Sequence, residues 1–291
     1  MSVRPRRSML YMPGSNPRAL DKARSLPADS LILDLEDSVA PDAKQLARER
    51  VVTALEQGGY GQRELIVRIN GLDTPWAQED IAAMADANTA PDGLLIPKLS
   101  TAAQVQEAIA LVEAAGCCDS IDIWLMTETP QCILNINEVA SAHPRIKGLV
   151  LGTSDLAKDT RVRHTPDRLG FIAALNLCVY AARANGLDVI DGVQLDLQDE
   201  TALRASCVQG RDLGFDGKSL IHPGQLAAAN EVFAPSAAEV DSARDIIDAF
   251  EQAQREGKGV VVVKGRLVEA LHVEEAKRCL ALAEAIQVLG D

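Results

Sequence analysis

Two acidic residues that follow short apolar runs are the strongest candidates for chemistry in this 291-residue sequence. Glu128 comes soon after the mostly apolar run 121–126, and Pro130 then suits the first turn of a helix. Asp155 follows the run 148–152 in a similar way. Carboxylates that lie close together cost several kcal/mol unless a positive charge neutralises them. Because Mg²⁺ binds through one or two protein carboxylates and leaves its other positions to water and substrate, the pair predicts a magnesium site.

Two simpler roles for these acidic residues stay open at this point. The dipole of the helix that follows stabilises a carboxylate at its start, without any metal. Polar residues at strand ends also serve as caps and surface salt bridges. Zinc is disfavoured, because neither the cysteines nor the histidines form a ligand cluster.

Further polar residues end the other apolar runs of the chain. They are Asp34, Glu36, Asp37, Arg68, Asn70, Lys98, Asp191, Asp216 and Lys218. If the runs are strands of a closed barrel, these residues all point to one mouth, which is where barrel enzymes carry out their chemistry. Lys98 there could form a Schiff base with a carbonyl substrate. The carboxylates nearby would raise its pKa instead, so the sequence favours a salt bridge.

The elements that would position these residues alternate regularly. Short apolar runs alternate with helix-length stretches, among them 42–56 and 165–185. Eight such units predict a closed (β/α)₈ barrel over residues 1–235, in preference to a doubly wound sheet. The predicted strands cover 8–11, 30–35, 65–70, 93–98, 121–126, 148–152, 187–193 and 214–221.

The last part of the chain, residues 236–291, does not continue this pattern. A polar helix over 236–256 is followed by strands at 260–263 and 266–268, joined by the turn Lys264-Gly265, and a final helix covers 272–288. We expect a C-terminal helix–hairpin–helix extension outside the barrel. Such an extension usually packs on a neighbour or acts as a lid, here over a neighbouring subunit.

Composition excludes several functions. The formal net charge is −13, which argues against a general nucleic-acid or membrane-surface binder, so an anionic ligand would need a local basic pocket. No apolar run has the length of a membrane span, and residues 1–7 contain no apolar signal region. The six cysteines have no metal-ligand spacing, as expected of reduced core residues. These features predict a cytoplasmic protein.

The chain resembles the citrate lyase beta-subunit family, which includes malyl-CoA, citramalyl-CoA and citryl-CoA lyases. The resemblance runs in order through nearly the whole chain. Its segments are Arg7-Ser8 through Pro13-Gly14, Leu33 through Pro41, Arg68-Ile69-Asn70-Gly71, Pro97-Lys98, Glu128-Thr129-Pro130, Gly152 with Asp155-Leu156, and Gly214 through Lys218 with Ile221-His222-Pro223.

The resemblance implies a (β/α)₈ (TIM) barrel, usually trimeric, either as a homotrimer or as a dimer of trimers. It implies Mg²⁺ held by Glu128 and Asp155, with a 2-oxo acid on the metal, and Glu36 and Asp37 beside it. Arg68 would stabilise the enolate oxygen of the acyl-CoA thioester. Basic residues match the region that binds the CoA phosphates, namely Arg7, Lys22 and Arg18.

One position departs from the family pattern. The C-terminal hairpin usually carries an Asp two residues before a Pro-His pair, whereas this chain has Glu269-Ala270-Leu271-His272. In the family the matching acid reaches a neighbouring subunit's site. We therefore expect Glu269 to act as the catalytic base across an oligomer interface, since Glu36 and Asp37 would be held ionised beside the cation.

The leading hypothesis is a Mg²⁺-dependent carbon–carbon lyase that cleaves a 3-hydroxyacyl-CoA into an acyl-CoA and a 2-oxo acid. A guanidinium and a metal would stabilise the two oxygens at which charge changes. A malyl-CoA thioesterase is the first alternative, and the beta subunit of a citrate lyase complex acting on an acyl-carrier-protein thioester is the second. The sequence does not choose the oxo acid.

Overall fold

The computed structural model describes residues 3–290 as two units, Arg6–Asn230 and the part of the chain from Glu231 on together with residues 3–5. The division falls inside helix α10 (Leu226–Phe233), a few residues before the boundary predicted at 235. Among the described residues, no helix combines the length and apolar character needed to cross a membrane.

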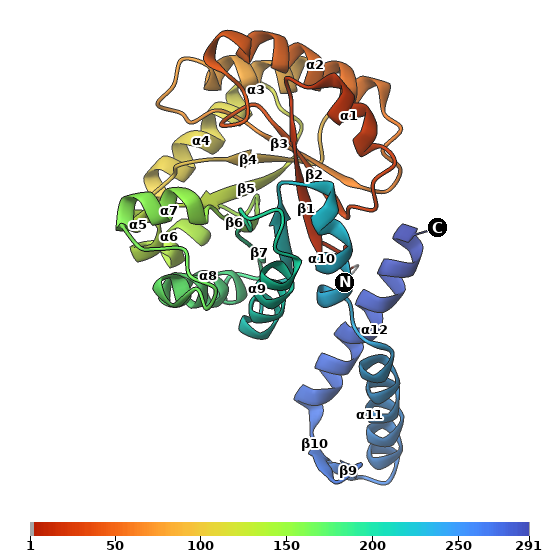
Figure 1. Ribbon diagram of the computed structural model, residues 1–291. Helices are drawn as coiled ribbons and strands as arrows, with labels where there is room; N and C mark the ends of the chain where they lie inside the picture. The colour runs from red at the N-terminus through yellow and green to blue at the C-terminus, as the bar shows by residue number, and fades with distance from the viewer. Residues whose placement is uncertain (1–2, 291) are drawn as a thin grey trace. The chain divides into compact units, whose positions relative to one another are not determined.

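Unit Arg6–Asn230 is built on eight parallel strands that close into a barrel in sequence order, which confirms the predicted (β/α)₈ architecture (Figure 1). Each strand pairs with the next along the chain, and β8 pairs with β1. The strands are β1 (Ser8–Pro13), β2 (Ser30–Asp34), β3 (Glu64–Arg68), β4 (Gly93–Ile96), β5 (Asp122–Thr127), β6 (Ile146–Leu151), β7 (Asp188–Asp191) and β8 (Gly217–Leu220).

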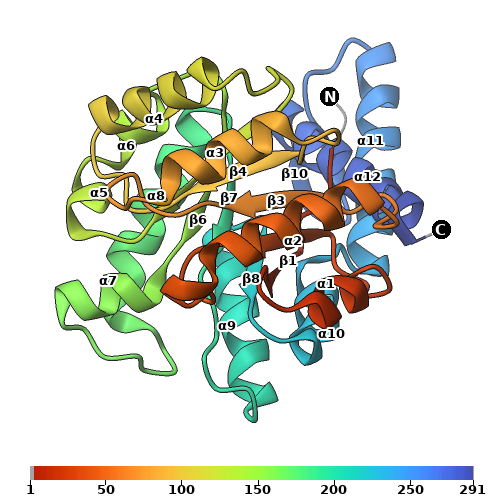
Figure 2. The same cartoon turned by 90° about the horizontal axis from the view of Figure 1, so that it is seen from above.

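Helices lie around this barrel (Figure 2). In chain order they are α1 (Pro17–Ala23), α2 (Lys44–Gln57), α3 (Ala77–Asp86), α4 (Ala102–Ala114), α5 (Pro130–Leu134), α6 (Ile136–Ala140), α7 (Thr153–Thr160), α8 (Ile172–Ala184) and α9 (Glu200–Leu213), followed by α10. The helix predicted over 165–185 is wrong in its first part. Arg168 adopts a left-handed conformation with φ of 52°, which a continuous helix does not allow, so α8 begins only at Ile172.

Alternation along the strands decides which side chains enter the barrel. Successive side chains of a strand point to opposite faces, and one set forms a fully packed interior cluster. Its members are Met9, Ile32, Ile66, Leu95, Trp124, Met126, Val150 and Ile190. Counting in steps of two from Ile32 and Ile66 leads to Asp34 and Arg68 at the carboxyl edge of the barrel. The same count from Met126 leads to Glu128, just beyond β5.

The opposite, amino edge of the barrel is closed by an ion-pair network. Arg6 donates through Nε and Nη2 to the carboxylate of Glu64 at 2.7 and 2.5 Å, and through Nη1 to Asp188 at 2.6 Å. Its guanidinium also lies over the Trp124 ring, 5.0 Å from the centroid. Because both Arg6 and Glu64 are buried, this network seals the barrel below the apolar cluster and leaves the carboxyl edge as the open end.

The C-terminal unit contains the predicted helix–hairpin–helix. Helix α11 (Ala237–Arg255) begins at a capping box in which Ser236 and Glu239 exchange hydrogen bonds. Strands β9 (Val261–Val263) and β10 (Arg266–Val268) pair antiparallel, and the turn residues Lys264 and Gly265 both have positive φ, as a two-residue hairpin turn requires. Helix α12 (Ala270–Gly290) completes the unit. Its small apolar cluster consists of Phe250, Val268 and Val273 with flanking Ile246, Ile247, Val261 and Val263.

Candidate active site

The centre of the mouth is Arg68, the last residue of β3. Its Nε and Nη2 donate to the two carboxylate oxygens of Asp34, both at 2.7 Å, which fixes the plane of the guanidinium. Nη1 lies 2.8 Å from Glu36 Oε2 and 3.4 Å from Asp37 Oδ2. The guanidinium also stacks 4.9 Å from the centroid of the Tyr11 ring. Arg68 is therefore held from three sides before any substrate arrives.

The pKa values of the acidic residues in this cluster depend on burial and on the basic side chains beside them. Burial alone would raise the pKa of Asp34, but the charge and hydrogen bonds of Arg68 hold it below its ordinary value. Burial raises the pKa of Glu36, and Arg68 and Lys98 oppose that shift only in part. Asp34 is thus the fixed anion of the cluster and Arg68 its fixed cation.

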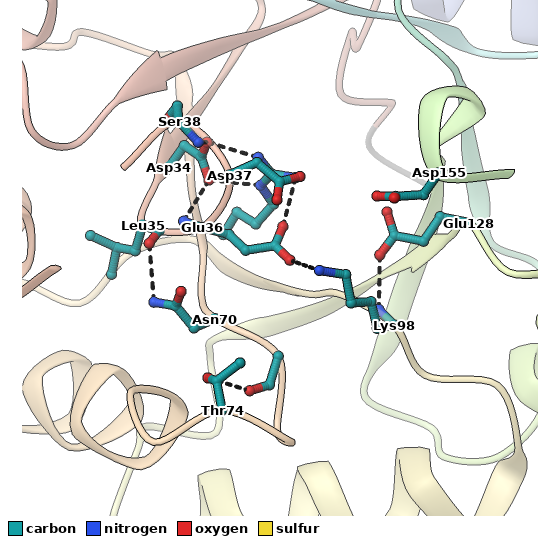
Figure 3. Close-up of polar contacts among 12 residues, drawn as sticks. Asp34, Leu35, Glu36, Asp37, Ser38, Asn70, Thr74, Lys98, Glu128 and Asp155 are labelled. Atoms are coloured by element: carbon teal, nitrogen blue, oxygen red, sulfur yellow. Dashed lines mark hydrogen bonds and ion pairs between the residues drawn. The ribbon is translucent and has the colours of Figure 1, made fainter. Parts of the chain in front are cut away.

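Lys98 connects this cluster to Glu128. Its Nζ donates to Glu36 Oε1 at 2.8 Å, and its backbone N–H donates to Glu128 Oε1 at 2.9 Å (Figure 3). Burial lowers the pKa of Lys98, but the hydrogen bond and charge of Glu36 outweigh it and leave the pKa raised. A Schiff-base lysine needs a lowered pKa. The predicted salt bridge is therefore what the structure shows.

Glu128 and Asp155 form the acidic side of the mouth. Figure 3 shows their carboxylates close together, one from the end of β5 and one from the first turn of α7. Burial, with the charges of Glu36 and Asp155 adding to it, raises the pKa of Glu128 to about 7. Asp155 is partly exposed and accepts a hydrogen bond from Lys158 at 3.1 Å on the same helix. No described cationic side chain lies within salt-bridge distance of Glu128. A bound metal ion would therefore supply the positive charge that this carboxylate lacks.

This arrangement fits a magnesium ion. Two carboxylates offer hard oxygen ligands, and Mg²⁺ completes its coordination with water and substrate. Across residues 3–290, no group of three or more His, Cys, Asp and Glu side chains is arranged to hold a metal ion by itself. Gly152 gives Glu128 its space, because a Cβ at that position would lie 2.6 Å from Glu128 Cβ and Oε2. The pair is therefore suited to an open site shared with a ligand.

A cavity of about 320 Å³ opens between the two halves of the mouth. Asp34 and Asp37, which both contact Arg68, lie on one side of the cavity, and Glu128 and Asp155 lie on the other (Figure 3). The remaining wall is largely apolar or uncharged, formed by Tyr11, Ser38, Met126, Leu151, Gly152, Thr153, Ser154, Val193, Leu195 and Ile221.

Not all residues predicted for the site are found together. Arg7 precedes β1 at the amino edge, where its Nε and Nη2 bind the carboxylate of Asp29 at 2.8 Å, so the structure does not bring it to this mouth. Arg18 and Lys22 are exposed on α1, which follows the carboxyl end of β1. Glu269 is exposed just before α12 in the C-terminal unit, and its backbone N–H donates to His272 Nδ1 at 3.0 Å.

The prediction that the polar ends of strands 7 and 8 face the mouth is wrong. Ile190 points into the barrel, so the next residue, Asp191, points outward, where it is fully buried and pairs with Lys218 at 2.9 Å. Arg168 donates to both oxygens of Asp191. Asp216 lies before β8, at the amino edge. These charges hold the barrel to its outer layer and do not line the site.

Sequence reasoning gave no role to Tyr11, and it singled out Asp34 only as part of a strand end. Both could have been found by counting in steps of two from the inward residues Met9 and Ile32. The uncharged Tyr11 ring in an apolar strand carried no chemical signal of its own. The partner that fixes Arg68 was visible only once the register Asp34 with Arg68 was known.

The fold and mouth define an α/β-barrel enzyme with an arginine opposite a pair of carboxylates. The HpcH/HpaI aldolase/citrate lyase family profile matches residues 7–223, and the chain belongs to that family, as the sequence motifs indicated. The chain is similar to a (3S)-malyl-CoA thioesterase of Cereibacter sphaeroides strain KD131, with 53% identity over 282 residues that cover 97% of this chain and 96% of that protein.

Two further similarities extend the comparison. An L-malyl-CoA/beta-methylmalyl-CoA lyase of Rhodobacter capsulatus is 37% identical over 306 residues, covering 97% of this chain and 96% of that protein. The crystal structure of the protein CitE from Mycobacterium tuberculosis in complex with magnesium, acetoacetate and coenzyme A superposes with a TM-score of 0.78 and 27% identity. It covers 98% of this chain and 100% of that one.

Proposed function

We propose that this protein is a Mg²⁺-dependent enzyme that hydrolyses a malyl-CoA-type thioester to malate and free CoA. The observation that carries the proposal is the cavity that places the fixed guanidinium of Arg68 opposite the Glu128–Asp155 pair. The 53% identical thioesterase supports hydrolysis, and the CitE complex with magnesium and coenzyme A supports both ligands.

Glu128 and Asp155 are the residues that would hold the metal. When bound, Mg²⁺ supplies positive charge that neutralises the two carboxylates and orients the oxygens of the substrate's own carboxylate and hydroxyl. Glu128 is the stronger candidate for a permanent ligand, because it is buried and already ordered by the backbone N–H of Lys98.

Arg68 would act on the thioester oxygen. Attack of water on the thioester carbon places negative charge on that oxygen, and a preorganised donor stabilises it. Asp34 keeps the guanidinium in place through two hydrogen bonds of 2.7 Å. The 3.4 Å contact of Nη1 with the exposed Asp37 is the weakest of the set, so it is the contact that a substrate oxygen would replace.

Glu269 is our proposed base. In hydrolysis it would take a proton from the attacking water, and the sulfur of CoA would leave with the electrons of the broken carbon–sulfur bond and pick up a proton. Glu269 would come from a second copy of the chain, as the family resemblance implies. Arg18 and Lys22 stay proposed contacts for the CoA phosphates, whereas Arg7 drops out because Asp29 binds it at the amino edge.

Carbon–carbon cleavage is the second candidate, and it was the leading hypothesis from the sequence. It would use the same site, since the enolate of the departing acyl-CoA also carries its charge on the thioester oxygen near Arg68. The base would then remove the proton of the substrate hydroxyl rather than that of water. The 37% identical lyase supports this reaction, while the higher identity to a thioesterase favours hydrolysis.

Product analysis decides between the two. Purified protein with Mg²⁺ and (3S)-malyl-CoA should release malate and one free thiol per substrate. A thiol reagent measures the free thiol, and chromatography identifies malate. Acetyl-CoA and glyoxylate would instead establish the lyase. Turnover only with an acyl-carrier-protein thioester would establish a citrate lyase beta subunit. Glu128→Gln protein purified in parallel is the control, and no turnover of any of these thioesters by the wild type would refute the proposal.

A further inference from the structure

Lys98 has an unusual backbone for its side chain. It follows β4 with φ of 62°, in the left-handed region that residues other than glycine, asparagine and aspartate rarely adopt. Strained backbone of this kind persists only where the surrounding structure fixes it, and it clusters at functional sites.

Hydrogen bonds with the segment after β5 hold the loop that contains Lys98. Ser100 Oγ and Thr129 Oγ1 share a hydrogen bond of 2.7 Å, and Asn135 Nδ2 donates to the carbonyl of Ser100 at 3.0 Å. Gln104 Oε1 accepts from the backbone N–H of Ser100 at 2.8 Å. The first two contacts tie the segment after β4 to the segment after β5, a few residues beyond Lys98 and Glu128.

The conformation gives Lys98 two contacts that point in different directions. Its backbone N–H donates to Glu128 Oε1, while its Nζ reaches Glu36 Oε1, 2.8 Å away. The other oxygen of Glu36 pairs with Arg68 at 2.8 Å. A single residue thus joins both halves of the cavity, and Figure 3 shows it between the two carboxylates.

We propose that Lys98 is a positioning residue whose left-handed backbone orients Glu128 for the metal and whose amine couples Glu128 to Arg68 through Glu36. This inference rests on the proposed function, because it assigns Glu128 to the metal. It predicts that the backbone conformation at position 98 contributes to metal affinity independently of the lysine charge.

A pair of substitutions separates the two contributions. Lys98→Asn and Lys98→Val both remove the amine, but asparagine accepts a left-handed backbone whereas β-branched valine does not. Isothermal titration with Mg²⁺ should therefore give an affinity about 10- to 100-fold weaker for Lys98→Val than for Lys98→Asn, the range found when a residue that orients a metal ligand is lost. Turnover should fall in both variants, because both lose the link to Glu36.

A second measurement needs no metal. In metal-free protein, the amide hydrogen of residue 98 should exchange slowly in the wild type and in Lys98→Asn, and at least about 10-fold faster in Lys98→Val and in Glu128→Ala, which lacks the acceptor. The inference would be overturned if the two Lys98 variants bound Mg²⁺ with equal affinity. It would also be overturned if Glu128→Ala left the exchange rate of the residue 98 amide hydrogen unchanged. A wild type that binds no Mg²⁺ would instead refute the proposed function, while the exchange data would still test the role of the backbone.

Discussion

The buried carboxylate of Glu128 should make the metal-free protein less stable as the pH rises. Its pKa is about 7 in the folded protein against an ordinary 4.5, so the folded state binds more protons between these pH values. Stability from this group is fully present below pH 4.5 and is lost as the pH rises through 7. The difference amounts to roughly 3 kcal/mol, because a change of one in pKa is worth about 1.4 kcal/mol.

Glu128→Gln removes this penalty while keeping an oxygen that accepts the Lys98 N–H. In EDTA, the variant should unfold at the same temperature as the wild type near pH 4.5. Near pH 8 it should be more stable by roughly 3 kcal/mol, or about 6–12 °C for a unit of this size. Mg²⁺ at 100 times its Kd should then stabilise the wild type by about 2.7 kcal/mol and leave the variant unchanged.

The assay is thermal unfolding followed by circular dichroism at several pH values, with and without Mg²⁺. Glu107→Gln, on the exposed face of α4, is the matched control for loss of one carboxylate. A Glu128→Gln advantage that is the same at pH 5 and pH 8 would refute the titration of Glu128. Equal stabilisation of both proteins by Mg²⁺ would place the metal elsewhere.

Four further outcomes are expected. Asp155→Asn should abolish Mg²⁺-dependent turnover and leave the circular dichroism spectrum intact, and activity near the wild-type level would exclude Asp155 as a ligand. Arg68→Lys should lower kcat by about 10²-fold, because lysine keeps the charge but not the planar fork held by its partner carboxylate; a change in KM alone would make Arg68 a binding residue only. Inactive Glu269→Gln and inactive Glu128→Gln proteins should regain activity when mixed, and no recovery despite proven subunit exchange would exclude a base acting across subunits. Lys218→Met should cost about 1–3 kcal/mol in urea unfolding, since Arg168 alone would remain with the buried Asp191, and a stability equal to the wild type would show the pair to be dispensable.

The barrel could be predicted because its strands are encoded locally. Most of the strands are short apolar runs, several of them with polar residues at or just beyond their ends, and all eight predicted strands overlap observed ones. The same strand-end pattern singled out Arg68, Glu128 and Asp155, and all three line the same cavity, while their roles stay predictions. The two C-terminal strands and their turn could also be predicted from the sequence, because Lys264-Gly265 separates two runs that contain valine and leucine.

What the sequence did not predict depends on strand register and on contacts between distant segments, which a pattern of apolar runs does not determine. Asp191 was assigned to the mouth from its position at a strand end, but one residue of register decides between the inner and outer face. Arg7 was assigned through a motif, and the motif does not show that Asp29, at the start of the next strand, would bind it. The left-handed backbone of Lys98 depends on contacts with the loop after β5, so no local sequence signal announces it.

We expect the charges in the mouth to set the order in which the metal and the substrate bind. Asp34 is neutralised by Arg68 and Glu36 by Lys98, whereas Glu128 has no ion-pair partner among residues 3–290 and Asp155 pairs with the exposed Lys158. The proposed substrate, malyl-CoA, brings one more carboxylate, and like charges that lie close together repel strongly in a partly buried site. We therefore expect Mg²⁺ to bind before the substrate. On this account malate in the absence of Mg²⁺ binds too weakly to be measured by calorimetry and binds measurably once the metal is present, and equal malate binding in EDTA would contradict it.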